Sequence, residues 1–304
     1  MHSGSIDPPR ARFEYVSCNL CRDDQTEPYH RERLRYFDEI IDLQVVRCRC
    51  CGLVYTNPRI VDANDLYIRG GVGELDAIEH HARAKANVFA RAIEEIERFC
   101  PTQRDGNPTR LLDIGCGTGH FLDAAQRRGF SVCGIEPAPL SAAYARGCFG
   151  VHVAESDVLE TEFDHATFDV ITAWDVIEHV PDPRAVIQRC TNWLKPGGIM
   201  ALRFPSAPWQ KLKGIVFQQL LRSNRAAFGA TMHLTFFTEQ TFRQMAQEEG
   251  LVVLRSRTTL AEANTHNFVL DGLKLASNVL AQTVEKVSGR HLGNLEVYCR
   301  RVSE

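Results

Sequence analysis

The sequence LLDIGCGTG, at residues 111–119, decides the fold of this chain. An apolar run meets a carboxylate, breaks into three glycines that alternate with other residues, and continues as HFLDAA at residues 120–125. This pattern predicts a strand, a tight turn and a helix, because glycine allows a sharp turn and a close approach of the backbone to a ligand. A helix start also offers backbone N–H groups that have no partner within the helix. The segment therefore predicts a ligand-binding loop at the end of a strand.

A second apolar run, SVCGI at residues 131–135, is followed directly by Glu136. A carboxylate at the end of the next strand is suited to accepting hydrogen bonds from the two hydroxyls of a ribose. We therefore predict a site for a cofactor that contains a nucleoside.

The glycine spacing excludes two common nucleotide sites. A dinucleotide site requires G-x-G-x-x-G, and here His120 or Leu122 stands where the third glycine would be. A phosphate-binding P-loop ends in Gly-Lys-Ser/Thr, and no lysine follows this glycine run. The cofactor is therefore expected to lack a pyrophosphate.

The pattern Asp113-x-Gly115-x-Gly117-x-Gly119 resembles motif I of the class I S-adenosylmethionine (SAM) methyltransferases. SAM carries an ammonium, a carboxylate and a sulfonium, and an acidic residue beside glycine N–H groups suits that distribution of charge. The resemblance continues in order through residues 109–304. It implies a Rossmann-like α/β fold with the cofactor at the carboxyl ends of the strands.

Further segments resemble other parts of that family. Asp157 looks like the acidic position after the third strand, which in the family bonds the adenine amino group. The run 168–175, which ends in Asp175, looks like the fourth strand, and VIEHVPDP at 176–183 is similar to the helix opening beside the cofactor. LKPGGIMAL at 194–202 resembles the turn into the fifth strand. The cofactor-binding residues that the resemblance implies are Asp113, Gly115, Gly117, Gly119, Glu136, Asp157 and Asp175.

Five of the eleven cysteines lie within the first 51 residues. Two C-x-x-C pairs, Cys18 with Cys21 and Cys48 with Cys51, have the spacing of a tetrahedral zinc site. Short alternating runs flank the second pair, so we predict a small zinc ribbon over residues 1–60. Because four cysteines leave no open coordination position, the zinc is expected to be structural.

The rest of the chain divides into a predicted connecting helix and a methyltransferase domain. The helix falls within residues 61–108, where apolar residues recur at helical spacing from about 75 to 99. Within the domain at 109–304, residues 205–232 are expected to form a substrate lid, and 262–293 an added helical segment. The lid segment is amphipathic and cationic, so peripheral contact with a membrane is an alternative to packing as a lid.

Two histidines are candidates for catalysis. His233 lies in HLTFF, which resembles a stretch of bacterial methyltransferases of secondary-metabolite, sugar and glycan pathways, where the histidine faces the substrate. We predict that His233 is the general base or orients the acceptor, because imidazole takes up a proton near neutral pH. His179 competes for this role and is expected to lie nearer the cofactor. The alternative is a histidine that only caps or packs its loop.

Composition restricts the partners and the compartment. A net charge of −3 gives no general attraction to nucleic acid or anionic membranes. Residues 1–10 lack the apolar core of a signal peptide, and no apolar run is long enough to span a bilayer. An odd number of cysteines favours a reducing compartment over a disulfide framework, so we expect a cytoplasmic protein.

A ribbon ahead of a SAM domain fits two functions, transfer to a small molecule, sugar or glycan and methylation of an RNA base. A nucleic-acid module should be basic, but residues 1–70 carry ten Arg, no Lys and eleven Asp or Glu. The Asn-Pro-Pro-aromatic signature of base methylation is also missing, because the fourth strand ends in AWDV at 173–176. We therefore predict transfer to a hydroxyl oxygen or carbon of a pathway intermediate, with RNA methylation as the alternative. The number of subunits stays open.

Overall fold

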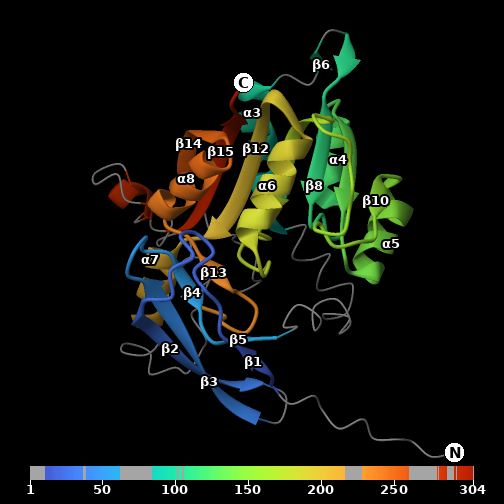
Figure 1. Ribbon diagram of the computed structural model, residues 1–304. Helices are drawn as coiled ribbons and strands as arrows, with labels where there is room; N and C mark the ends of the chain where they lie inside the picture. Colours follow the sequence, from blue (N-terminus) through green and yellow to red (C-terminus); the bar gives the residue numbers. More distant parts are fainter. Residues whose placement is uncertain are drawn as a thin grey trace, which may run out of the picture.

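The computed structural model describes residues 11–36, 39–61, 84–100, 103–104, 106–215, 228–259, 279, 281–285, 291 and 293–303. A large layered α/β unit carries a small β module at the carboxyl ends of β11 and β12 (Figure 1). The mostly parallel sheet confirms the predicted Rossmann-like fold.

The large unit is built on one seven-stranded sheet in the order β10-β9-β8-β11-β12-β15-β14. Neighbouring strands from β10 to β12 are parallel, whereas β15 is antiparallel to both β12 and β14. β11 is buried along its whole length, as an apolar central strand between two helical layers should be. The strands are β8 (Arg110–Ile114), β9 (Ser131–Ile135), β10 (His152–Ala154), β11 (Phe168–Trp174), β12 (Leu194–Pro205), β14 (Leu251–Thr259) and β15 (Asn294–Arg301).

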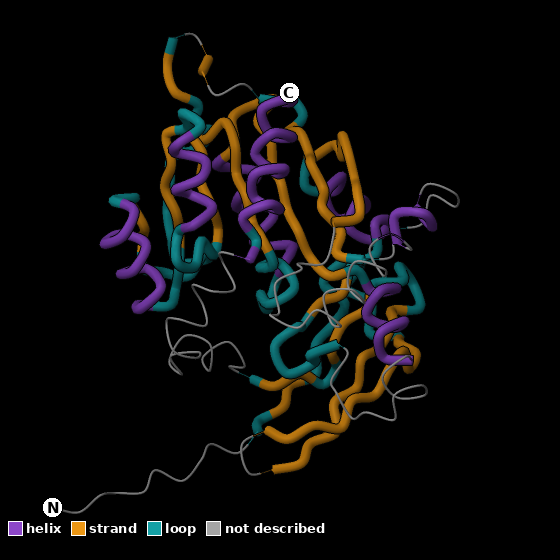
Figure 2. The backbone as a smooth tube through the Cα atoms, turned by 180° about the vertical axis from the view of Figure 1, so that it is seen from behind, coloured by secondary structure: helices purple, strands orange, loops and turns teal. Residues whose placement is uncertain are grey.

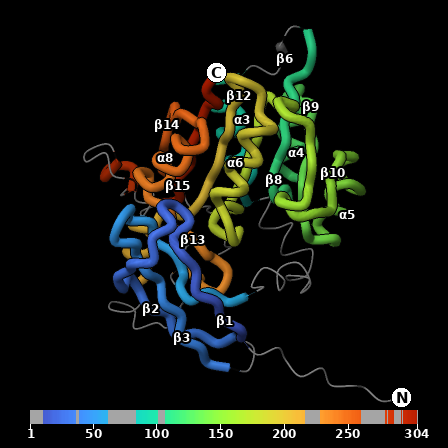
Figure 3. Tube along the Cα trace, viewed as in Figure 1, coloured from blue at the N-terminus to red at the C-terminus, as the bar shows by residue number. Residues whose placement is uncertain are grey.

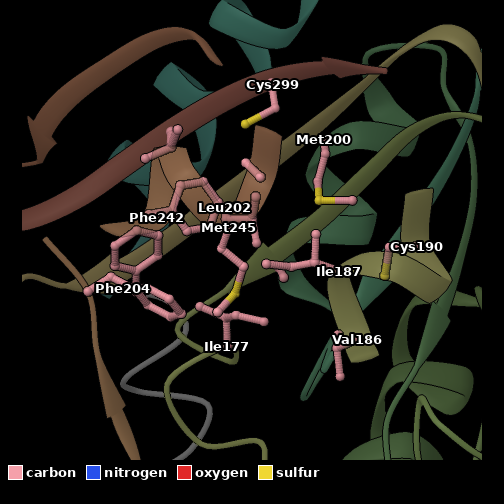
Figure 4. Close-up of a cluster of buried hydrophobic side chains, with 14 of the residues drawn as sticks. Ile177, Val186, Ile187, Cys190, Met200, Leu202, Phe204, Phe242, Met245 and Cys299 are labelled. Atoms are coloured by element: carbon pink, nitrogen blue, oxygen red, sulfur yellow. The ribbon is translucent and has the colours of Figure 1, made fainter. Parts of the chain in front are cut away.

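Helices cover both faces of this sheet, as the two opposite views in Figures 1 and 2 show. The core of one face joins α3 (Ala86–Phe99), α4 (His120–Arg127) and α5 (Pro139–Phe149) to the sheet. The core of the other face joins α6 (Pro183–Trp193) and α8 (Glu239–Glu248) to it. Figure 4 shows part of this second core, where Phe242 and Met245 of α8 lie near Leu202 of β12.

The small β module has a four-stranded sheet in the order β13-β4-β3-β2. A long hairpin of β2 (Thr26–Tyr36) and β3 (Glu39–Cys48) is followed by β4 (Val54–Thr56), and β1 (Phe13–Glu14) pairs with β5 (Arg59–Ile60). The outer strand β13 (Thr235–Phe236) comes from far along the chain and pairs antiparallel with β4. We call this module, including β13, the ribbon.

Several predicted segments are described only in part. The connecting helix appears as α3 from Ala86, and its predicted start, before residue 84, lies outside the described residues. In the predicted lid, α7 (Ala207–Ile215) is described and residues 216–227 are not. Of 262–293, the described residues are 279 and 281–285, which are helical, 291 and 293. Two antiparallel strands of two residues each, β6 (Gln103–Arg104) and β7 (Asn107–Pro108), precede β8.

The helices of the described part of the chain include none that is long and apolar enough to cross a membrane.

Candidate active site

The glycine loop lies between β8 and α4, as the sequence predicts, and its three glycines differ in their surroundings. Each has a positive φ, +62° for Gly115, +52° for Gly117 and +80° for Gly119. A Cβ on Gly115 would meet a methyl of Val176 at 2.6 Å, and one on Gly119 would meet Ala145 at 2.7 Å. A Cβ on Gly117 would meet nothing within 4 Å. Gly115 and Gly119 therefore permit close packing, and Gly117 leaves the open side that a ligand can approach.

Asp113 and Glu136 are both almost fully buried beneath this loop. Glu136 accepts a hydrogen bond from the N–H of Gly117 at 2.8 Å and another from Ala138 at 2.9 Å. Asp113 accepts one from the Thr172 hydroxyl on the neighbouring strand at 2.6 Å. Each carboxylate oxygen of Glu136 keeps a second lone pair that can accept from a ribose hydroxyl. Glu136 thus holds the loop through Gly117, whereas Asp113 joins β8 to β11 beneath it.

Burial decides the protonation of this acidic pair. Desolvation, together with the nearby charge of Glu136, raises the pKa of Asp113 to about 8. Desolvation likewise raises the pKa of Glu136, against the two backbone N–H groups that favour its charged form. Since burial raises both pKa values, the pair favours a neutral form, and a cationic ligand placed beside it would favour the ionised form.

The other two predicted acidic residues lie in different surroundings. Asp157 lies in an exposed turn after β10, and its carboxylate accepts from the N–H of Leu159 at 2.7 Å. Asp175 follows β11 with a φ of +58° and is held between Lys85 at 2.7 Å and Arg203 at 3.2 Å. Despite burial, those two cations hold the pKa of Asp175 well below its usual range.

The structure brings the two candidate histidines together. The rings of His179 and His233 are 4.6 Å apart between centroids, at an interplanar angle of 69°. Nδ1 of His179 donates to the carbonyl of Met232 at 3.1 Å, and Nδ1 of His233 donates to that of Phe228 at 2.8 Å. Because a carbonyl oxygen only accepts, both Nδ1 atoms carry the proton and both Nε2 atoms carry the lone pair.

Glu178 is the third member of this cluster. Its side chain is 1% exposed, and its Oε2 has no hydrogen-bond partner within the part of the chain that the structure describes. Ligand atoms of Glu178, His179 and His233 all lie within 4.8 Å of one another, close enough to hold a divalent cation. We call these three residues the acceptor-side cluster. Val176 touches Gly115, so the loop that carries Glu178 and His179 lies against the glycine loop.

The histidines of the cluster are neutral at neutral pH. Desolvation and the neighbouring His179 lower the pKa of His233 to about 3. Desolvation also lowers the pKa of His179, but its bond to Met232 and the charge of Asp175 oppose that effect. Desolvation and the charge of Asp175 raise the pKa of Glu178 well above its usual value. Each imidazolium would repel the other, so the pair can take up one proton at a time.

The four predicted zinc ligands form a compact cluster. Sγ of Cys18 and Cys51 are 3.5 Å apart, those of Cys21 and Cys48 are 3.4 Å apart, and all four lie within 4.8 Å of one another. Zn–S bonds of about 2.3 Å in a tetrahedron place sulfurs about 3.8 Å apart. The eleven cysteines are all free thiols. The donor set therefore fits a structural zinc ion, which would link the two knuckles.

Four residues near the site were not predicted from the sequence. The sequence could have indicated Glu178, because this residue directly precedes His179 in the segment 176–183. The signal for Arg203 was weaker: it is a cation within the apolar second half of strand β12. Lys85 and Thr172 had none, because each joins the site through a contact between segments that are distant in the sequence.

The sheet order, the glycine loop and the buried acid after β9 define a class I SAM-dependent methyltransferase. The chain belongs to the methyltransferase domain family, whose model matches residues 83–256, more than half of its length.

Curated relatives are similar over part of this region. A ubiquinone biosynthesis O-methyltransferase of Idiomarina loihiensis is 39% identical over 99 residues, 29% of this chain and 39% of the relative. One of Serratia proteamaculans is 34% identical over 146 residues, 40% of this chain and 59% of the relative. The matches thus span about two fifths to three fifths of these relatives.

Solved structures share the fold at low sequence identity. Phosphoethanolamine N-methyltransferase 2 of Haemonchus contortus, in complex with S-adenosyl-L-methionine, has a TM-score of 0.53 at 17% identity. That match covers 83% of this chain and 63% of the other. The plantazolicin methyltransferase BpumL, in complex with SAH, has a TM-score of 0.53 at 15% identity and covers 79% of this chain and 94% of its own. These two structural matches establish the fold alone.

Proposed function

We propose that this enzyme transfers the methyl group of SAM to a hydroxyl oxygen of a small biosynthetic intermediate. The single observation that carries the proposal is the acceptor-side cluster, in which two neutral histidines lie together and His179 follows three residues after Val176, which packs against Gly115. The sulfonium of SAM is already activated, so the protein needs chiefly to align the nucleophile and remove its proton. The name of the curated relatives, ubiquinone biosynthesis O-methyltransferase, supports oxygen as the acceptor atom.

We assign different roles to the two histidines. The carboxylate of Asp175 and the bond to Met232 favour a proton on His179, so His179 is the better proton acceptor. The pKa of His233, about 3, makes it a weak base, and we assign it the orientation of the acceptor through Nε2. Glu178, which keeps its own proton because its pKa is raised, is then a neutral neighbour of the pair.

The low basicity of this pair bears on the acceptor. Proton transfer to a weak base is easiest from an acidic hydroxyl, and a phenol, with a pKa of about 10 as in tyrosine, is far more acidic than a sugar hydroxyl. We therefore propose a phenolic hydroxyl first and a sugar or glycan hydroxyl second.

The cofactor contacts are part of the proposal. Gly115, Gly117, Gly119 and Glu136 hold the nucleoside and amino-acid ends of SAM, with Asp113 beneath the loop. Asp157, in its exposed turn, is assigned to the adenine. Asp175 is assigned to the edge of the cofactor site, where its ion pairs with Lys85 and Arg203 fix the loop after β11.

We also propose that Cys18, Cys21, Cys48 and Cys51 hold one structural zinc ion. Metal analysis of freshly purified protein should find one zinc per chain. The double variant Cys18→Ser with Cys48→Ser should lose it, because two thiolates cannot complete a tetrahedral site. Zinc that is absent from the native chain, or retained in the double variant, would contradict the assignment.

The test of the proposed chemistry is a screen for S-adenosylhomocysteine release from SAM with phenols, nucleotide-linked sugars and oligosaccharides. With the best acceptor, His179→Ala should lower kcat by about 10²–10⁴, the usual contribution of a general base. His233→Ala should raise KM for the acceptor, and the exposed control His152→Ala should change neither constant. Burial lowers both histidine pKa values below 6.5. As the pH is lowered, kcat/KM should therefore begin to fall only below pH 6.5. Native turnover in both His179→Ala and His233→Ala would overturn the assigned roles.

A further inference from the structure

The ribbon is hydrogen-bonded directly to the backbone that carries His233. Its strand β4 pairs with β13, which begins two residues after His233. Thr56, the last residue of β4, donates from its backbone N–H to the carbonyl of Leu234 at 3.0 Å. Its hydroxyl donates to the carbonyl of His233, also at 3.0 Å. Thr56 is fully buried, so both bonds are shielded from water. Strand β4 therefore fixes the peptide units on both sides of Leu234, the residue next to His233.

The same segment is bonded in turn to the loop that carries His179. The N–H groups of Leu234 and Thr235 both donate to the carbonyl of Glu178, at 2.7 and 3.2 Å. The side chain of His179 returns a bond to the carbonyl of Met232 at 3.1 Å. Figure 3 shows β13 beside the blue strands of the ribbon and beneath α6. Strand β4, the segment that carries His233 and the loop that carries His179 are thus joined one after another by hydrogen bonds.

The first cysteine knuckle holds the far end of the His179 loop. Asn19, inside the first C-x-x-C, donates from Nδ2 to the carbonyl of Pro181 at 3.1 Å, and Arg59 donates to the same oxygen at 2.7 Å. Arg184, at the start of α6, donates back to the carbonyls of Asn19 and Leu20 at 3.1 and 2.6 Å. Because Asn19 and Leu20 lie between two cysteines, these contacts require a folded knuckle.

The cofactor loop is held differently. The bonds of the Glu136 carboxylate go to Gly117 and Ala138, and that of Asp113 goes to Thr172, all within the large unit. The ribbon therefore supports the acceptor side of the site and leaves the support of the cofactor loop to the sheet.

We infer that the ribbon positions the histidine pair, so that a folded, zinc-loaded ribbon is required for methyl transfer but not for SAM binding. This inference rests on the proposed function of the pair. Thr56, Asn19, Arg59 and Arg184 are its positioning residues. Small displacements of a reacting pair are costly, so the ribbon controls the rate although its metal ligands take no part in the chemistry.

Thr56→Val tests the inference, because valine keeps the shape of threonine and removes the hydroxyl. Hydrogen exchange at the amides of Leu234 and Thr235 should become faster, since the segment that contains them has lost one hydrogen bond to β4. The kcat with the best acceptor of the screen should fall by roughly 10- to 100-fold. SAM affinity by calorimetry and zinc content should stay native. Thr56→Ser, which keeps the hydroxyl, should restore the native values.

Thr191→Val is the matched control, because Thr191 is also buried and its hydroxyl donates to a backbone carbonyl, that of Ile187 within α6. It should leave every readout unchanged. Removal of zinc from the native chain by a chelator under reducing conditions should speed exchange at the same amides and leave exchange in residues 110–127 as it was. Native exchange in both Thr56→Val and the zinc-free chain would overturn the inference, as would a parallel loss of SAM affinity. Native turnover in His179→Ala and His233→Ala would instead remove the proposed function and leave the exchange result standing.

Discussion

For Asp113, the sequence predicts the loop that follows it but not the contacts of its carboxylate. Its place before the glycines predicts the loop, and the loop is there. Its carboxylate, however, turns to Thr172 inside the sheet, and burial raises its pKa to about 8. The sequence could not show this, because the depth of a side chain depends on strands and helices that pack over it from elsewhere.

The buried Asp113 predicts a pH dependence of stability. The folded chain keeps the proton up to about pH 8, whereas the unfolded chain loses it near its ordinary value of 3.8. The unfolded state therefore binds fewer protons in this window, and this group lowers the free energy of unfolding as pH rises from 4 to 8. Asp113→Asn should thus gain stability relative to the native chain between pH 5 and pH 8, measured by urea unfolding without SAM. A difference that stays constant with pH would contradict the raised pKa.

Among the elements, those set by local sequence were predictable and those set by distant pairing were not. The β8 strand, its loop and α4 follow from one continuous pattern, and the ribbon follows from cysteine spacing. The pairing of β13 with β4 was not predicted, because neither short strand carries information about its partner. The contact of Lys85 with Asp175 was missed for the same reason. The two histidines were proposed separately, and only the fold shows them as a pair.

Helix α3 provides a test of how the elements are joined. Glu95 is buried on α3, where it bonds Arg255 of β14 at 2.6 Å and Arg98 at 3.0 Å. Glu95→Gln should lower the free energy of unfolding by about 1–3 kcal/mol, since it removes charged hydrogen bonds from a buried site. Glu94→Gln, one residue earlier on the exposed face, should change it by less than about 0.5 kcal/mol. Equal urea midpoints for the two variants would show that this ion cluster does not join α3 to the sheet.

At the level of the whole chain, two units of unequal size share one site. The large sheet carries the glycine loop, and the ribbon, completed by β13, lies at the carboxyl ends of β11 and β12 (Figure 1). There Thr56 bonds the backbone of His233 and Leu234. On the proposed roles, cofactor binding and acceptor alignment depend on different parts of the molecule, and methyl transfer requires both.

The most direct measurement is calorimetric titration of SAM into the native chain, Glu136→Ala and Glu136→Gln. The native chain should bind one SAM. Glu136→Ala should weaken binding by about 1–3 kcal/mol, because it removes the proposed charged hydrogen bonds to the ribose and the hydrogen bond from the Gly117 N–H. Glu136→Gln, which keeps the shape, should lie between the two. Unchanged affinity in Glu136→Ala, with the fold intact by circular dichroism, would contradict the placement of SAM in this loop.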